Sequence, residues 1–268
     1  MNRMDPKSDF LFRIRTVKAA PFRTLIEAIK DILTDVNLEF DSTGIKIMAM
    51  DGTHTILVHL RLQADRFDEY YCPAKHILGV NMINFFKLVK TMSNSESIVL
   101  YVKKSDTTKL GVDILNGEKQ MVTHYSLNLI EVDVCPIPIP PVQFPSIITM
   151  PSTDFQKIIR DMHTLGEIVE IQSASQELVF RCKGDFADQE TIFSIGQSGL
   201  MQSKVASEIV QGNFHLKFLV LFTKCTSLCS DISLYMKNDY PLIVEYNVAG
   251  LGEIKLALAP ASQADPSS

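Results

Sequence analysis

Apolar residues recur with helical spacing in several short segments of the chain. In the first of them, Leu25 and Ile26 follow Phe22 by three and four positions, which places all three on one face of a helix. In another, "MPSTDF" puts a proline and a Ser/Thr pair just before the expected helix, as is common at helix N-termini. The segments that carry the predicted helices are residues 21–35, 81–92, 150–162 and 213–225.

Short runs rich in β-branched and aromatic residues lie between these helices and favour strands. Examples are "GIKIMAM" at 44–50 and "PLIVEY" at 241–246. Helices mixed with several strands predict the α+β class. The other predicted strands are residues 55–62, 97–103, 110–115 and 177–182.

The sequence contains an internal repeat. When residues 22–47 are laid on residues 155–180 without a gap, nine apolar residues fall on apolar residues, from Phe22 on Phe155 to Ile47 on Phe180. Further along, "SIVLYVKK" at 97–104 matches "DISLYMKN" at 231–238. Each half therefore reads as a helix, strands, a second helix and more strands, and we predict two similar domains.

The segment "CPIPIPPVQF" at 135–144 lies between the two copies. Proline has no N–H group and a fixed φ angle, so an extended connector on the surface is expected rather than a central strand. A plain linker would be polar, but Ile137 and Ile139 are apolar. These side chains either pack back onto a domain or bind a partner.

Composition narrows the class of protein. Hydrophobic residues make up 46% and charged residues 21%, as in ordinary globular proteins, so disorder and fibrous repeats are not indicated. No apolar run reaches the length of a membrane span and the first residues lack an apolar signal region, so we expect an intracellular protein. The five cysteines do not form a disulfide framework, which fits a reducing compartment.

Positive charge is concentrated on the predicted helices although the net charge is −5. Each helix carries a pair of basic residues spaced three or seven positions apart, within about 60° of each other around the helix axis. An ordinary solvated helix face is the simplest explanation for any one pair. If all four faces line one surface along DNA, screening by salt makes the attraction loose and independent of sequence. The eight residues are Arg23, Lys30, Lys87, Lys90, Lys157, Arg160, Lys217 and Lys224.

Seven segments, in order along residues 12–260, together resemble the proliferating cell nuclear antigen family of DNA sliding clamps. They are "IEAIKDIL", "GIKIMAMDGTH", "GVNMINFFKLVK", "MPSTDFQKIIRDM", "LFTKC", "PLIVEY" and "KLALAP". The resemblance implies two α+β domains with helices inside and antiparallel sheets outside. The implied organisation is an N-terminal extension at 1–11, a first domain at 12–130, a connector at 131–145, a second domain at 146–260 and a tail at 261–268.

The resemblance also implies a homotrimeric ring that encircles double-stranded DNA without sequence preference, with the eight basic residues facing the DNA. Such a clamp makes polymerases processive and binds peptides of the DNA polymerase, the clamp loader, ligases and nucleases, in the nucleus or a viral replication compartment. Edge strands at 109–116 and 177–184 would join neighbouring chains, as uncovered edges invite pairing. The implied interface residues are Leu110, Val112, Ile114, Leu178, Phe180 and Cys182.

A pocket for partner peptides is implied beside the connector. Three positions depart from the family pattern: Thr55 replaces an aliphatic residue, Ala257 a tyrosine, and Ser175 a lysine that accepts ubiquitin in eukaryotic relatives. These departures suggest a divergent lineage such as that of a large DNA virus. The implied pocket residues are Met50, His54, Thr55, Leu57, Ile137, Ile139, Pro140, Pro241, Ala259 and Pro260.

Other functions remain open at this point. Catalysis is disfavoured because the sequence has no phosphate-binding glycine loop, no GxSxG motif and no zinc spacing, and His54 and His59 would point to opposite faces of a strand. We therefore expect no enzyme, no metal and no cofactor. The alternatives are a subunit of a heterotrimeric checkpoint-type clamp, a clamp-derived viral transcription factor, or a two-domain scaffold. Cys225 and Cys229 are a redox pair or core residues, and we favour the core.

Overall fold

This computed structural model describes residues 9–133, 137–138, 141–174, 176–194, 196, 200–204 and 208–261, except for the side chains of 202–204. The described residues divide into two compact units, which are treated separately. Unit 1 takes its residues from Met1–Ala49, Val58–Ile137 and Asn247–Ile254, and unit 2 from Met50–Leu57, Pro138–Tyr246 and Lys255–Ser268. Strands β3, β4, β17 and β18 contribute residues to both units. Ile139, Pro140 and Ser175 lie outside the described residues.

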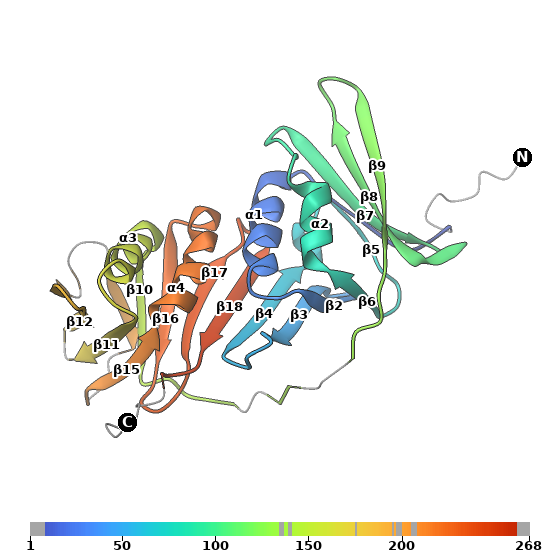
Figure 1. The fold of residues 1–268 in the computed structure, drawn as a ribbon. Helices are drawn as coiled ribbons and strands as arrows, with labels where there is room; N and C mark the ends of the chain where they lie inside the picture. The colour runs from blue at the N-terminus through green and yellow to red at the C-terminus, as the bar shows by residue number, and fades with distance from the viewer. Residues whose placement is uncertain are drawn as a thin grey trace, which may run out of the picture. The chain divides into compact units, whose positions relative to one another are not determined.

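Unit 1 consists of two helices in contact with each other and two antiparallel sheets (Figure 1). The helices are α1 (Ala19–Lys30) and α2 (Met82–Val89), and η2 (Ala64–Arg66) is a short 3₁₀ turn. One sheet has the order β5 (Glu69–Tyr71), β1 (Phe10–Thr16), β7 (Glu96–Lys103), β8 (Asp106–Asn116) and β9 (Met121–Asn128). To the other sheet, which has further strands, this unit contributes in order β4 (Ile56–Gln63), β3 (Gly44–Met50), β2 (Asp35–Asp41) and β6 (His76–Asn81).

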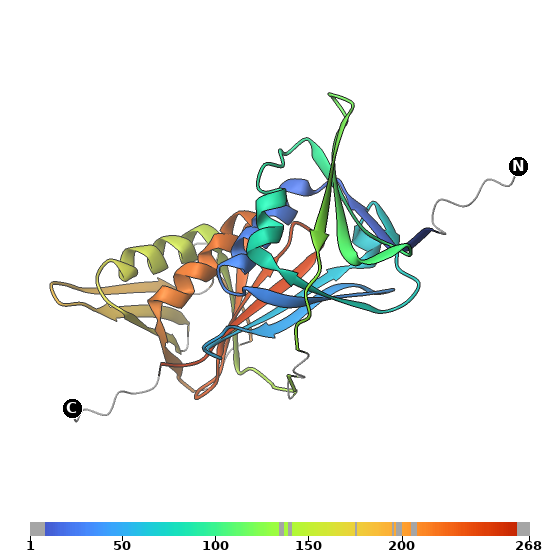
Figure 2. The ribbon, with the colours of Figure 1, turned by 45° about the vertical axis from the view of Figure 1, so that its right-hand side comes forward.

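Unit 2 has the same construction, with helices α3 and α4 in contact (Figure 2). The helices are α3 (Ser152–His163), α4 (Leu216–Phe222) and the 3₁₀ helix η3 (Thr223–Leu228). To one sheet, which has further strands, this unit contributes in order β14 (Met201–Lys204), β10 (Ser146–Pro151), β16 (Asp231–Met236), β17 (Leu242–Asn247) and β18 (Gly252–Leu258). The other has the order β13 (Asp188–Ser194), β12 (Glu177–Lys183), β11 (Ile168–Ala174) and β15 (Val210–His215).

The predicted repeat is confirmed by the positions of equivalent elements. Helix α1 begins at Ala19 and α3 at Ser152, and the strand pair β2–β3 recurs as β11–β12. In both helices the residues with helical spacing are buried, among them Phe22 in α1 and Phe155 in α3. The apolar spacing thus specifies the buried face of each helix, and burial of that face provides most of the helix stability.

The helix ends differ from the predictions. Ser152 lies inside α3 and gives the helix no side-chain cap; its hydroxyl donates instead to the Cys229 carbonyl at 2.7 Å. Residues 213–215 of the fourth predicted helix belong to β15, and α4 ends at Phe222, after which the chain continues as η3. The apolar run there was too uniform to mark these boundaries. Among the described residues, no helix is long and apolar enough to cross a membrane.

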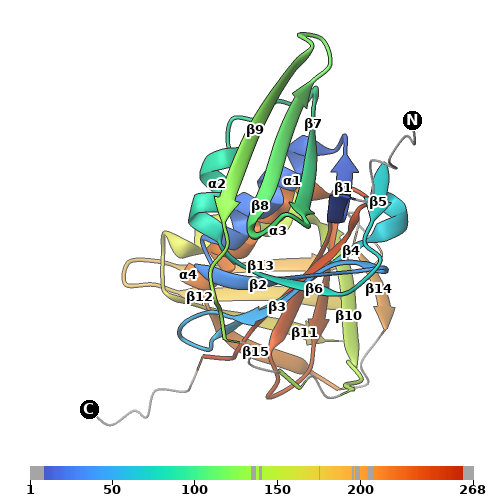
Figure 3. The same cartoon turned by 90° about the vertical axis from the view of Figure 1, so that its right-hand side faces the viewer.

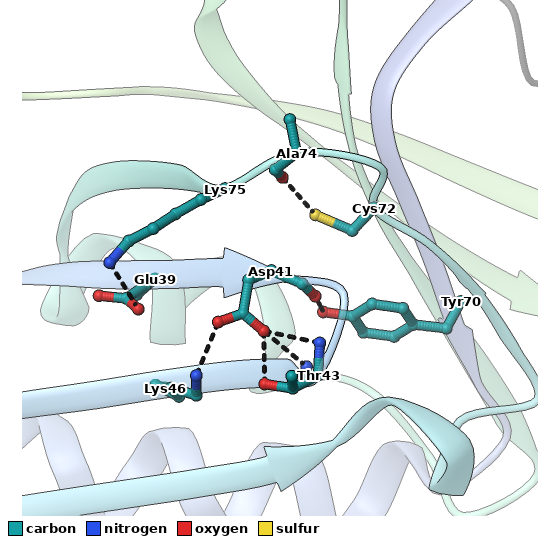
Figure 4. A network of polar contacts seen from close by, with 9 residues as sticks. Glu39, Asp41, Thr43, Lys46, Tyr70, Cys72, Ala74 and Lys75 are labelled. Atoms are coloured by element: carbon teal, nitrogen blue, oxygen red, sulfur yellow. Dashed lines mark hydrogen bonds and ion pairs between the residues drawn. The ribbon is translucent and has the colours of Figure 1, made fainter.

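A polar network holds the turn between β2 and β3 (Figure 4). The Asp41 carboxylate accepts hydrogen bonds from the Thr43 N–H at 2.7 Å and from the Lys46 ammonium at 2.6 Å. Burial alone would raise the pKa of Asp41, but these donors hold it well below its usual value. Gly44 has φ of +145°, and a Cβ atom there would meet the Leu62 carbonyl oxygen at 1.8 Å. This turn therefore requires glycine.

Candidate functional site

The basic residues of α1 are partly buried and have partners within unit 1. The Arg23 guanidinium donates to the Met92 carbonyl. The Lys30 ammonium lies 2.7 Å from Asp31 Oδ1 and 4.9 Å from the ring centroid of Phe86. These contacts hold both cations in place, and the Asp31 carboxylate neutralises part of the charge of Lys30.

The basic residues of the other helices are more exposed. Lys87 and Lys90, at the end of α2, and Lys157 and Arg160 of α3 all have exposed side chains. In unit 2, exposed Lys217 lies in α4 with its ammonium 4.8 Å from the ring centroid of Phe218. The last predicted pair is split between two elements, because Lys224 lies in η3.

Strands β8 and β12, predicted as the edges used for assembly, are interior strands. β8 lies between β7 and β9, and β12 lies between β11 and β13. The prediction is therefore wrong, because each strand already has hydrogen-bonded neighbours on both sides. The six implied interface residues are all buried within their units: Leu110, Val112, Ile114, Leu178, Phe180 and Cys182.

The end strands next to β8 and β12 are β9 in unit 1 and β13 in unit 2. Figure 3 shows β9 at the outer side of its sheet. Both strands carry large exposed apolar side chains: Met121 and Val122 on β9 are 47% and 46% exposed, and Ile192 on β13 is 53% exposed. An uncovered strand edge with apolar side chains is a surface suited to pairing with another chain.

The loop between β3 and β4 is organised by one carboxylate, that of Asp51. Its oxygens accept hydrogen bonds from the N–H groups of Thr55 at 2.7 Å and Ile56 at 2.6 Å, and from the N–H and hydroxyl of Thr53. Burial alone would raise the pKa of Asp51, but these donors outweigh it and lower the pKa. His54 follows with φ of +57°, a conformation that the loop imposes. Asp51 therefore has a structural role in this loop.

A cavity of about 340 Å³ opens beside this loop in unit 2. Three of the implied pocket residues line it, namely Thr55, Ala259 and Pro260. Sequence reasoning missed the rest of its wall, which comes from β15, α4 and the end of the chain. These lining residues are Thr53, His215, Lys217, Phe218 and Ala261.

The other implied pocket residues are distributed between the units. Met50, His54, Leu57 and Pro241 belong to unit 2 and are exposed or half-buried. Ile137 belongs to unit 1, where it is half-buried. Lys217, predicted to face DNA, lines the cavity described above.

The described residues contain no group of three or more His, Cys, Asp or Glu side chains that could hold a metal ion. Cys225 is fully buried, and burial raises the pKa of its thiol to about 12, so the reactive thiolate is absent at neutral pH. This supports the assignment of Cys225 to the core.

Comparison with known proteins identifies the family. The model of the N-terminal domain of proliferating cell nuclear antigen matches residues 11–136, and the model of its C-terminal domain matches residues 138–261. The chain belongs to the proliferating cell nuclear antigen family. As a member of this family it has the α+β clamp fold and is a non-enzymatic protein, as the sequence predicted.

Two individual proteins that resemble this chain also support its membership of the proliferating cell nuclear antigen family. The chain is 36% identical over 254 residues to "Probable DNA polymerase sliding clamp 1" of Paramecium bursaria Chlorella virus 1, covering 93% of this chain and 97% of the relative. The crystal structure of Proliferating Cellular Nuclear Antigen from Entamoeba histolytica superposes with a TM-score of 0.84 at 28% identity, covering 94% of this chain and 99% of that one.

Proposed function

We propose that this chain is a DNA polymerase sliding clamp that encircles double-stranded DNA as a homotrimer and recruits replication and repair enzymes. The observation that carries the proposal is the concentration of exposed cations on the helices of both units, in a chain with net charge −5. The viral relative, whose printed name is that of a probable polymerase sliding clamp, agrees with it. The expected site of action is the nucleus or a viral replication compartment.

The helix-borne cations suit a mobile attachment to DNA. Two unit charges about 10 Å apart in water interact by only about 0.4 kcal/mol, and salt screens them beyond about 8 Å. Exposed cations such as Lys157 and Arg160 therefore attract the phosphate backbone weakly and without reading bases. A clamp that must slide requires this weak attraction.

The internal repeat suggests how the ring closes. In the repeat, β9 is equivalent to β18 and β13 to β4. The ends of β18 and β4 lie side by side: in unit 1 the Gln63 N–H donates to the Leu251 carbonyl at 2.9 Å, and in unit 2 the Ala259 N–H donates to the Thr55 carbonyl at 3.0 Å. Pairing of β9 with β13 of another chain would repeat this arrangement between subunits. Three chains is the number that the family resemblance implies.

Recruitment is assigned to the cavity lined by Thr55, Ala259 and Pro260, with the connector residues Ile137, Ile139 and Pro140 as the further wall that the resemblance implies. Burying one apolar anchor of a partner peptide contributes about 1.5–3 kcal/mol. Three anchors, less the cost of ordering the peptide, correspond to micromolar binding at about −8 kcal/mol. Binding of this strength recruits an enzyme and still allows exchange.

Charge reversal tests the DNA-binding part of the proposal. The double variant Lys157→Glu/Arg160→Glu is expected to lower the stimulation of polymerase processivity on primed circular DNA by about tenfold or more, because it replaces two exposed cations of α3 by anions. The matched control is Lys104→Glu, which reverses an exposed lysine outside the helices. Equal stimulation by both variants would show that the helices do not face DNA.

A further inference from the structure

Strand β15 is the last strand of its sheet, and its outward backbone groups are only partly occupied. The Gln211 N–H donates to Asn238 Oδ1 at 2.8 Å, and Asn238 Nδ2 donates to the Ile209 carbonyl at 3.0 Å. The side-chain amide of Asn238 thus takes the place of a peptide group at this end of the edge. At the other end, the Ala261 N–H donates to the Asn213 carbonyl at 2.8 Å.

Two groups remain between these caps, the carbonyl of Gln211 and the N–H of Asn213. A residue in a strand directs its N–H and its carbonyl to the same side, so both groups point away from β11, which pairs with the opposite side of β15. Neither has a hydrogen-bond partner among the described residues. They flank Gly212, which adds no side chain beyond Cα.

This arrangement selects the direction of an added strand. In antiparallel pairing two incoming residues would reach these groups, one at Gln211 and one at Asn213, and each would leave its second backbone group without a partner, because the caps already occupy the N–H of Gln211 and the carbonyl of Asn213. In parallel pairing a single incoming residue donates to the carbonyl of Gln211 and accepts from the N–H of Asn213. The exposed edge is therefore complementary to one residue of a chain running parallel to β15.

A cavity of about 450 Å³ lies over these two groups and provides room for such a segment. Its wall includes Gly212, Tyr240 and the exposed side chain of Ile209. Pro260 and Ala261 line both this cavity and the 340 Å³ cavity assigned to partner peptides. A chain parallel to β15 runs from the Ile209 end towards His215, which lines the second cavity.

We propose that the β15 edge is a main-chain docking site for the residues that precede the anchor residues of a partner peptide, and that these residues bind as a short parallel strand. The inference rests on the proposed recruitment function and extends it, because the cavity holding the anchors is the adjoining one. Since the contact is made by the peptide backbone, it adds affinity without restricting the sequence of the flank.

The test compares two synthetic peptides by calorimetry. The core peptide carries a glutamine, an isoleucine and two phenylalanines, and the flanked peptide has four additional serines on its N-terminal side. Two added backbone hydrogen bonds should make the flanked peptide bind about tenfold more tightly to the unmodified protein. Hydrogen exchange at the Asn213 amide should slow with the flanked peptide only.

The variant Asn213→Pro removes the N–H at a position where an edge strand tolerates proline, and its matched control Asn213→Ala keeps the N–H. Asn213→Pro should abolish the tenfold gain and leave the core peptide unaffected, whereas Asn213→Ala should preserve the gain.

A second measurement changes the peptide and leaves the protein unmodified. Each flank residue of the peptide is N-methylated in turn, and methylation at one position should abolish the gain. Equal binding of both peptides to the unmodified protein would overturn the inference while leaving recruitment intact. Failure to bind even the core peptide would overturn the proposed recruitment site itself.

Discussion

Strands β9 and β15 both lie at the end of a sheet, but they differ in how many of their outward backbone groups are hydrogen-bonded by other residues. The outward groups of β15 are capped by Asn238 and Ala261, which leaves two groups accessible. Within the described residues, no backbone hydrogen bond caps the outer side of β9, and Met121 and Val122 are exposed there. A capped edge admits a short segment, whereas an uncapped edge of this length admits a whole strand. The same fold can thus reserve one edge for peptides and another for assembly.

The largest effect is expected from substitutions on β9, the strand whose outer edge is uncapped. In Met121→Asp/Val122→Asp, two apolar side chains that would contribute about 1.5–3 kcal/mol each on burial become charged. The subunit dissociation constant should rise at least about 100-fold, as measured by sedimentation. Val17→Asp, a change at an apolar side chain 53% exposed outside the strands, is the control and should leave assembly unchanged. An unchanged oligomer in the double variant would remove β9 from the interface.

Asp51 provides a second case in which a side chain satisfies backbone groups, here in a loop. Asp51→Asn should lower the free energy of unfolding by about 1–3 kcal/mol, because an amide cannot accept all the donors that the carboxylate accepts. The lowered pKa of Asp51 means that its contribution is fully present above the unfolded-state pKa of about 3.9 and is lost as pH falls through the lower folded-state value.

Urea unfolding between pH 7 and pH 3 checks the Asp51 prediction. The difference in unfolding free energy between the unmodified protein and Asp51→Asn should be largest at pH 7 and shrink at the acidic end. A difference that does not change with pH would show that the carboxylate charge is not the stabilising feature.

The cap of β15 should contribute less, because it consists of two hydrogen bonds at an exposed position. Asn238→Ala should lower the free energy of unfolding by about 1 kcal/mol by leaving the Gln211 N–H and the Ile209 carbonyl to water. Asn213→Ala removes another exposed amide side chain of this edge region and serves as the control. Equal unfolding free energies for the two variants would contradict the capping role of Asn238.

The smallest effect is expected at the start of the connector in unit 1. Asn37 Nδ2 donates to the carbonyls of Val132 at 3.1 Å and Asp133 at 3.4 Å. Asn37→Ala should speed amide exchange across residues 130–133 several-fold and change global stability by about 0.5 kcal/mol. Asn81→Ala removes a hydrogen bond to Asp35 and the cap of α2, both elsewhere in the unit, and should leave exchange in 130–133 as it is.

The helices, the repeat and the family were predictable from sequence because they depend on local spacing and on order along the chain. The strand edges were not. Leu110, Val112 and Ile114 alternate as they would in any half-buried strand, and alternation indicates which face is buried without identifying the neighbouring strands. Strands β8 and β12 were therefore taken as edges, although the end strands beside them are β9 and β13.

The candidate cavity was only partly predictable for a related reason. Thr55, Ala259 and Pro260 were taken from motifs that resemble the family, whereas His215 and Phe218 lie in a uniformly apolar stretch with no motif of its own. Only the fold brings these separate segments of the chain together. Lys217 also lines the cavity, a position that its helical spacing did not indicate, and its predicted contact with DNA stays a prediction.

The molar mass in solution tests the central claim most directly. Light scattering over a dilution series at moderate salt should give about 90 kDa, three times the 30.1 kDa of one chain, for the unmodified protein. Met121→Asp/Val122→Asp should give the mass of one chain under the same conditions. A mass of about 30 kDa for the unmodified protein at micromolar concentration would contradict the homotrimeric clamp and favour a subunit of a hetero-ring.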